Sequence, residues 1–247
     1  MKLTNDVELV DGLPVAYIKS LDSIVLSDIH LGYEGVMAKK GMLFPKVNLN
    51  NVIKVVGSAL EATGAGRIIV DGDIKNEFSK VDLEEFNELY DFATFVNGTG
   101  AQLTLIKGNH DNFVDRYSGP LKFSVFRQEA ALGKYFFFHG EELPKKIAKE
   151  TKMMIMGHEH PAIGIGRMIG KREKLRCFLY GKYMNFKLLV LPAVGYFSSG
   201  TEINMSERED LLSPVFSRVN INEMRAIVCD YGETMDFGRI GALRKVV

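Results

Sequence analysis

The chain has 247 residues, 46% of them hydrophobic, which is enough for a sizeable core in one large domain or two small ones. Its 31 basic and 31 acidic residues cancel, which argues against a surface wholly covered by nucleic acid but not against a local basic patch. The first residues lack the apolar core of a signal peptide, and no stretch carries the roughly 18 uncharged apolar residues of a membrane span. We therefore expect a cytoplasmic protein without membrane contact.

The first half of the chain alternates predicted strands and helices. Apolar runs at 24–27, 67–70 and 102–106 are typical of buried strands. A first helix is predicted by Leu49, Val52, Ile53, Val56 and Leu60, with Asn48 as its cap. A second is predicted by Leu83, Phe86, Leu89, Ala93 and Val96, entered by Ser79 and Asp82 and ended by Gly98. This order implies parallel strands with helices on a face, and ligands bind beyond the carboxyl ends of such strands.

Two more runs, 135–138 and 153–156, lead into histidines. The second is rich in methionine, and its parallel position in the sequence, more than its propensity, predicts a strand. After Pro161, short strands near 175–179, 188–191 and 225–229 suggest a mixed second sheet stacked on the first, with 196–215 as a long polar loop. With no clean linker or repeat, we expect one domain over residues 1–247, in which Cys177 and Cys229 are reduced and buried.

All five histidines fall within five short motifs, each at the end of a predicted strand. The motifs are Asp28-Ile29-His30, Gly72-Asp73, Gly108-Asn109-His110-Asp111, His139-Gly140 and Gly157-His158-Glu159-His160. Each motif alone is weak: Gly72-Asp73 is an ordinary turn, Asn109 is a helix-cap type, and His158 with His160 is a common loop pair. The ordered set, which leaves no histidine over, favours a metal site instead.

The ligand types indicate the kind of metal and reaction. Imidazole and carboxylate ligands without thiolate suit manganese, iron or zinc. The motifs hold enough nitrogen and oxygen ligands for two adjacent divalent ions, and two such ions activate water and clamp phosphoryl oxygens. The sequence therefore predicts a metal-dependent phosphoesterase.

The motif set, from about Asp28 to His160, resembles the calcineurin-like metallophosphoesterase superfamily. The amino-acid sequence of residues 28–34 and 157–161 is similar to that of the compact SbcD-related phosphoesterases of archaea and of the DNA ligase-associated ones. The resemblance implies an α/β fold: a four-layer α/β/β/α sandwich of two mixed β-sheets flanked by helices.

The resemblance also implies roles for individual residues. One metal would be held by Asp28, His30, Asp73 and His160, and the other by Asp73, Asn109, His139 and His158, with Asp73 as the bridge. We expect two divalent ions, manganese ahead of iron and zinc. An activated hydroxide would attack phosphorus, and His110, beside Asn109, would steady the transition state and protonate the leaving oxygen.

Asn76 and Asp111 are expected to support these groups without holding a metal. Many superfamily members carry Asp where this chain has Asn76, and that Asp orients the catalytic histidine and favours its charged form. An amide orients a ring but supplies no charge, so we expect His110 to be a weaker acid–base group. The Arg that follows in protein phosphatases is also absent, which argues against a protein phosphatase.

The substrate is left open among three hypotheses. The leading one is a phosphodiesterase acting on a nucleotide or nucleic acid, the second a phosphomonoesterase of a small metabolite, and the third an inactive interaction scaffold of the same fold. Residues 166–187 are strongly basic and would bind a polyanion if they lay beside the site, but an edge strand exposes lysines too. Tyr33 and Phe113 would stack on a base or belong to the core. A homodimer is a candidate assembly.

Overall fold

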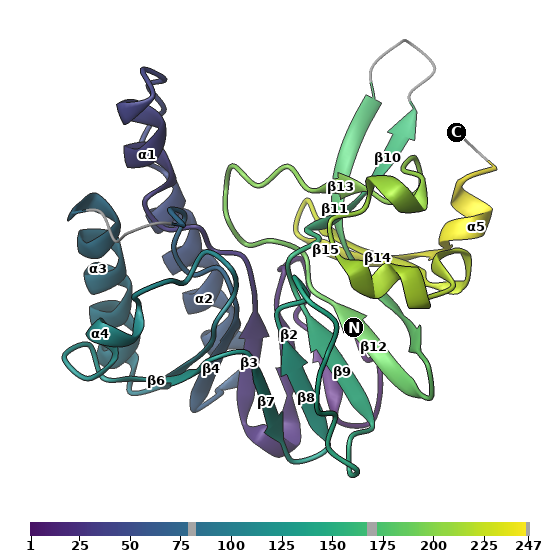
Figure 1. Cartoon of the computed structure of the whole chain (residues 1–247), viewed down its shortest axis with the longest axis horizontal. Coiled ribbons are helices and arrows are strands. Elements are labelled where there is room, and N and C mark those ends of the chain that lie inside the picture. The colour runs from purple at the N-terminus through teal and green to yellow at the C-terminus, as the bar shows by residue number, and fades with distance from the viewer. Residues whose placement is uncertain (79–82, 167–171, 246–247) are drawn as a thin grey trace.

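The apolar runs of the first half of the chain form one sheet of a two-sheet sandwich (Figure 1). The structure is a computed structural model and describes residues 1–78, 83–166 and 172–245. The sheet has the order β1-β2-β3-β4-β5-β6. Its strands are β1 (Val7–Leu9), β2 (Ala16–Ile18), β3 (Ser23–Leu26), β4 (Arg67–Asp71), β5 (Gln102–Ile106) and β6 (Phe123–Phe126). Strands β3 to β6 are parallel, as the β-α-β-α-β pattern predicts for β3 to β5.

Helices α2 (Asn48–Thr63) and α3 (Leu83–Thr99) cover the outer face of this sheet (Figure 1). Val56 and Phe92 are fully buried there against Ile24 and Ile68, and each such side chain contributes about 1.5–3 kcal/mol by leaving water. The short helices η1 (Lys19–Leu21), α1 (Tyr33–Lys39) and α4 (Asp115–Ser118) complete this half.

Both predicted helices form, but their ends differ from the expectation. Asn48 is not the cap of α2; Oε1 of Glu34 accepts the N–H groups of Val47 and Asn48, at 2.9 and 2.8 Å, and satisfies that end. Helix α3 continues past Gly98 and ends at Thr99. The next residue, Gly100, takes the left-handed conformation that commonly ends a helix. Ser79 and Asp82, the predicted entry to α3, lie outside the described residues.

The second sheet has the order β13-β10-β11-β12-β9-β8-β7, with β14 and β15 joined to it through β11. Its strands are β7 (Glu129–Leu132), β8 (Tyr135–Phe138), β9 (Met153–Met156), β10 (Pro161–Gly166), β11 (Arg172–Tyr183), β12 (Phe186–Val190), β13 (Thr201–Glu202), β14 (Arg225–Asp230) and β15 (Glu233–Arg239). The methionine-rich run is the strand β9, parallel to both β8 and β12. The predicted long loop is mostly irregular but contains β13 and η2 (Arg208–Asp210).

The two sheets pack face to face through a shared apolar layer. Val25 and Ile69 of the first sheet and Phe137, Ile155 and Leu189 of the second are fully buried in it. The far face of the second sheet is covered by the short helices η3 (Pro214–Arg218), η4 (Ile221–Glu223) and α5 (Ile240–Leu243) (Figure 1). The predicted α/β/β/α sandwich of two mixed sheets is confirmed, although its fourth layer consists of single helical turns.

Two smaller expectations are met in the same layers. Cys177 and Cys229 are buried and form no disulfide. They lie on the neighbouring strands β11 and β14. Among the helices that the structure describes, none combines the length and apolarity needed to cross a bilayer.

Asp6 ties the N-terminal segment to the second sheet. Its carboxylate accepts hydrogen bonds from the hydroxyls of Ser20 and Tyr135, each at 2.6 Å, and Nζ of Lys134 lies 2.7 Å away. Burial acts to raise the pKa of Asp6, but Lys134, Ser20 and Tyr135 together hold it well below its usual value. The charged carboxylate therefore stabilises the fold.

We predict that Asp6→Asn lowers the free energy of unfolding by about 1–2 kcal/mol near neutral pH. Because the folded-state pKa is depressed, this stability is present above the ordinary aspartate pKa of roughly 4 and is lost as the pH falls below it. Urea denaturation near neutral pH and at about pH 3 measures the change, with the exposed Asp91→Asn as control. An equal loss at both pH values would contradict the role of the charge.

Candidate metal centre

The predicted metal ligands meet where the carboxyl ends of strands from both sheets come together. Asp28 and His30 follow β3, Asp73 follows β4, and Asn109 follows β5, so the first sheet supplies four of them. The second sheet supplies the other three: His139 follows β8, and His158 and His160 follow β9. The structure therefore brings the five motifs to one edge of the sandwich.

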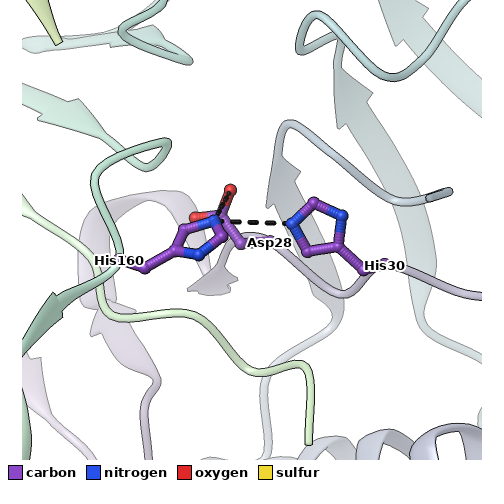
Figure 2. Close-up of side chains that lie close together, drawn as sticks. All are labelled: Asp28, His30 and His160. Atoms are coloured by element: carbon purple, nitrogen blue, oxygen red, sulfur yellow. Dashed lines mark hydrogen bonds and ion pairs between the residues drawn. The ribbon is translucent and has the colours of Figure 1, made fainter. Parts of the chain in front are cut away.

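One group of side chains comprises Asp28, His30 and His160, which point toward one another (Figure 2). Nε2 of His160 lies 3.0 Å from Oδ1 of Asp28 and 3.4 Å from Nε2 of His30. One ligand atom from each residue lies within 4.8 Å of the others, as a shared cation requires. Asp28 is fully buried, and Ser27 and the His158 N–H bond its carboxylate and fix its direction.

A second group comprises Asp73, His139 and His158, again with ligand atoms within 4.8 Å of one another. Asp73 also groups with His30 and His110 by the same criterion, so it lies between the two groups. This is the position predicted for a bridging carboxylate. Oδ1 of Asp28 lies 3.7 Å from Nε2 of His139, which brings the two groups close enough for adjacent ions.

A positive charge would stabilise the contact between Asp73 and His139. Nδ1 of His139 donates to the Asp71 carbonyl oxygen at 2.8 Å, so in the neutral ring Nε2 turns a lone pair toward Oδ2 of Asp73, 3.1 Å away. Burial acts to lower the pKa of His139, but the Asp73 carboxylate raises it above its ordinary value. A proton relieves the repulsion between the two acceptors, and a metal cation does the same.

Three more predicted ligands, Asn109, His30 and His158, present an uncharged donor atom that a metal ion could bind. Oδ1 of Asn109 is buried, and within the described ranges it has no hydrogen-bond partner, an arrangement that costs about 1–3 kcal/mol unless something binds there. Burial lowers the pKa of His30 and of His158 to about 4, so both rings are neutral near neutral pH. The donor set therefore fits divalent metal ions.

Backbone strain is concentrated on these residues. Asp28, His30, Asp73, His158 and His160 all have positive φ, between 48° and 67°. Non-glycine residues avoid this region, and each such residue costs on the order of 1 kcal/mol or more. All five are Asp or His, which adopt this conformation more often than most residues do, and in the 28–30 and 158–160 motifs both strained residues belong to a ligand group.

Gly72 lets the two sheets approach each other at the centre. Its φ is +86°, and a Cβ at this position would overlap the ring of His139. Gly157 is similar, because a Cβ there would overlap the Ser27 hydroxyl. The glycines of the Gly-Asp and Gly-His motifs are therefore required by close contact across the two sheets.

His110 is partly exposed, with Nε2 3.8 Å from Oδ2 of Asp73. Its Nδ1 donates to the backbone carbonyl oxygen of Asn76. The expectation that the Asn76 side-chain amide holds this ring is therefore corrected: the residue acts through its main chain. Asp111 does not join the ligand groups; it accepts the N–H groups of Gly108 and Lys75 at 2.9 and 3.3 Å, and burial raises its pKa to about 7.

Glu85, on α3, is a supporting residue that the sequence did not reveal. Its buried carboxylate accepts the N–H groups of Asn76, at 2.9 Å, and of Glu77. The Glu77 N–H and the Asn76 carbonyl belong to the same peptide group, so a carboxylate and the His110 ring bind opposite sides of one amide. The carboxylate polarises that amide and strengthens it as an acceptor for His110.

Asn48 is the second supporting residue that was missed, because it was interpreted as a helix cap. Its buried amide donates to the carbonyl oxygens of Ile29 and His30, at 3.0 and 2.9 Å, and accepts the Tyr196 N–H at 2.8 Å. It thus clamps the strained 28–30 turn to the loop after β12. Only its position before a helix was visible in the sequence.

The described part of the basic stretch 166–187 is spread along β11 and the hairpin that follows it, and Arg167 and Lys171 lie outside the described residues. β11 runs for 12 residues, roughly 40 Å. Arg176, near its middle, donates to the Tyr196 carbonyl oxygen at 3.3 Å, whereas Lys182 and Lys187 face each other at the hairpin end. Nucleic-acid binding through this stretch stays a prediction.

Comparison with known proteins places the chain in a family. The sequence pattern of the calcineurin-like phosphoesterases matches residues 23–187. The chain belongs to this family. A calcineurin-like phosphoesterase is a metal-binding hydrolase that acts on ester bonds, which confirms the enzyme class predicted from the motifs. A search of curated protein sequences gave no match.

Two solved structures are similar to this phosphoesterase. The Pseudomonas putida nuclease MPE aligns with a TM-score of 0.65 at 16% identity, over 93% of this chain and 94% of that one. Yfce, a phosphoesterase from E. coli, aligns with a TM-score of 0.41 at 18% identity, over 70% of this chain and 79% of that one. The first of these shows that the two-sheet fold is shared with a nuclease.

We predict that Asn48→Ala lowers the free energy of unfolding by about 1–3 kcal/mol, because it leaves buried backbone groups unpaired. It should also weaken manganese binding by about 10–100-fold, the usual effect of losing a group that orients ligands. Urea denaturation and calorimetric titration with Mn²⁺ measure the two effects. Asn51→Ala is the control, since Asn51 makes one hydrogen bond, at 3.2 Å, to Val194. Lower stability with unchanged manganese affinity would rule out the orienting role.

Proposed function

We propose that this calcineurin-like phosphoesterase is a two-metal phosphodiesterase that cleaves a nucleotide or nucleic acid. The observation that carries the two-metal proposal is the position of Asp73, which shares ligand groups with His30 and His110 and with His139 and His158. The buried Asn109 oxygen, unpartnered among the described residues, adds to it. One ion would be held by Asp28, His30, Asp73 and His160, and the other by Asp73, Asn109, His139 and His158. Manganese is the preferred metal, ahead of iron and zinc.

When bound, two such ions lower the pKa of a shared water and neutralise phosphoryl oxygens. The chain's own part in the reaction lies with His110. Because Nδ1 is committed to the Asn76 carbonyl, Nε2 is the ring atom available to the substrate. A proton on Nε2 would pass to the leaving oxygen.

The side of the centre next to His110 supports a nucleoside as leaving group. The Phe78 ring lies against the His110 ring, with centroids 3.5 Å apart, and Phe78 is 49% exposed. Phe113 is 45% exposed, with the Arg116 guanidinium 5.1 Å from its ring centroid, so of the two aromatic residues proposed from the sequence this one is the more accessible. Tyr33 instead stacks on Phe197, with centroids 4.9 Å apart. Exposed rings beside a leaving-group site suit bases, and the fold is shared with a nuclease.

The first test compares bis(p-nitrophenyl) phosphate with p-nitrophenyl phosphate as substrates in the presence of Mn²⁺. The wild-type protein should cleave the diester faster, and His158→Ala should lower its rate by at least about 100-fold, because a metal ligand is lost. Lys54→Ala, on the exposed face of α2, is the control. Faster cleavage of the monoester would overturn the diesterase assignment and favour a metabolite phosphatase.

The second test concerns the Glu85 carboxylate. If the Glu85 carboxylate strengthens the hydrogen bond between the Asn76–Glu77 amide and His110, Glu85→Gln should lower kcat about tenfold for a diester with an alkyl alcohol as leaving group. This is part of the roughly 10²–10⁴-fold acceleration that proton transfer contributes. The kcat for a diester that releases p-nitrophenolate, which leaves without a proton, should change little. Glu84→Gln, the neighbouring residue on α3, is the control. An equal loss with both leaving groups, or a loss of bound manganese, would show that Glu85 is only structural.

A further inference from the structure

A cavity of about 740 Å³ lies at the end of the sandwich opposite the metal centre. Strands β8 and β9 begin beside it, at Tyr135 and Met153, and end at the turns that carry His139 and His158. The length of these strands therefore separates the cavity from the ligand groups. Residues 4–6 of the N-terminal segment line its other side.

Four lysines line this cavity, and the pairing of four strands and their preceding turns places them in a row. The Lys152 N–H donates to the Lys134 carbonyl oxygen at 2.8 Å, and the Lys187 N–H donates to that of Lys152 at 3.2 Å. Lys187 on β12 lies directly opposite Lys182 on β11. Like charges directly opposite each other destabilise a sheet, so this row carries a cost unless an anion sits among the ammonium groups.

The positive charge of the cavity is not neutralised by the protein. Asp6 is the acid in its lining, and it is already bound by Lys134, Ser20 and Tyr135. In the part of the chain that the structure describes, Lys152, Lys182 and Lys187 form no ion pair.

The neighbouring cavity, which shares Lys182 and Lys187, is different. Its two arginines, Arg225 and Arg239, are paired with Asp236 and with Glu223. Unlike those arginines, three of the four lysines at the first cavity have no ion pair within the described ranges.

The floor of the cavity is apolar. Met153 and Tyr135 are buried in it, whereas Phe186, which also lines it, packs against the core on the other face of the second sheet. The volume lies within the range of pockets that hold small organic ligands. Lysine ammonium groups at the rim match a ligand with several negative charges.

We propose that this cavity binds a polyphosphate anion, with its phosphates on Lys152, Lys182 and Lys187. The site is separate from the metal centre and is independent of the diesterase proposal.

The proposal is tested by calorimetric titration of ATP and of inorganic triphosphate into the protein in EDTA, which removes metal-dependent binding. The wild-type protein should bind both saturably. The double variant Lys182→Ala/Lys187→Ala should bind both at least about tenfold more weakly, since two charged contacts are lost. Circular dichroism checks that each variant folds.

The matched control is Lys54→Ala/Lys149→Ala, which removes two exposed lysines elsewhere. No saturable binding, or equal weakening in both double variants, would overturn the proposal. So would an oligonucleotide that binds more tightly than ATP and loses this binding in Lys182→Ala/Lys187→Ala, because the cavity would then serve a nucleic-acid backbone. Nitrophenyl diester hydrolysis in the Lys182→Ala/Lys187→Ala variant should equal that of the wild type. This readout separates failure of the cavity proposal from failure of the catalytic one.

Discussion

The arrangement of this phosphoesterase depends on the contact between Asp73 and His139. One residue comes from the first sheet and the other from the second, and both are buried, so a carboxylate and an imidazole face each other across the junction of the sheets. Two unprotonated acceptors would repel there, whereas a proton on the ring or a metal cation between the two groups holds the sheets together at this edge. A positive charge at this contact therefore stabilises the closed sandwich.

The rest of the molecule supports strained turns at that edge. The ligand residues with positive φ are stable only because neighbouring groups bind their backbone. Asn48 binds the carbonyl oxygens of the 28–30 turn, and Glu85 binds the amides of the 76–77 turn. Both come from the helices of the first sheet, which thus hold the site as well as the core.

The sequence predicted those features that local patterns carry. Apolar runs located the strands that end in ligands, and motif order predicted that His30, Asp73 and His139 would meet. It could not predict Asn48 and Glu85, because a helix-cap type and a polar helix position look the same whether or not they touch a distant turn. It also could not place the basic residues 166–187 relative to the site, because composition does not show how a 12-residue strand spreads them. The metal-ligand assignments remain predictions until a metal is measured.

The division of ligands between the sheets has a consequence for biosynthesis. In the proposed two-ion site, Asp28 and His30 would share an ion with His160, and Asp73 and Asn109 would share one with His139 and His158. A ribosome-bound chain that has released only the first sheet would hold an incomplete set for either ion. Metal capture would therefore come after the second sheet has docked, and a loaded centre would mark a chain whose two halves have assembled correctly.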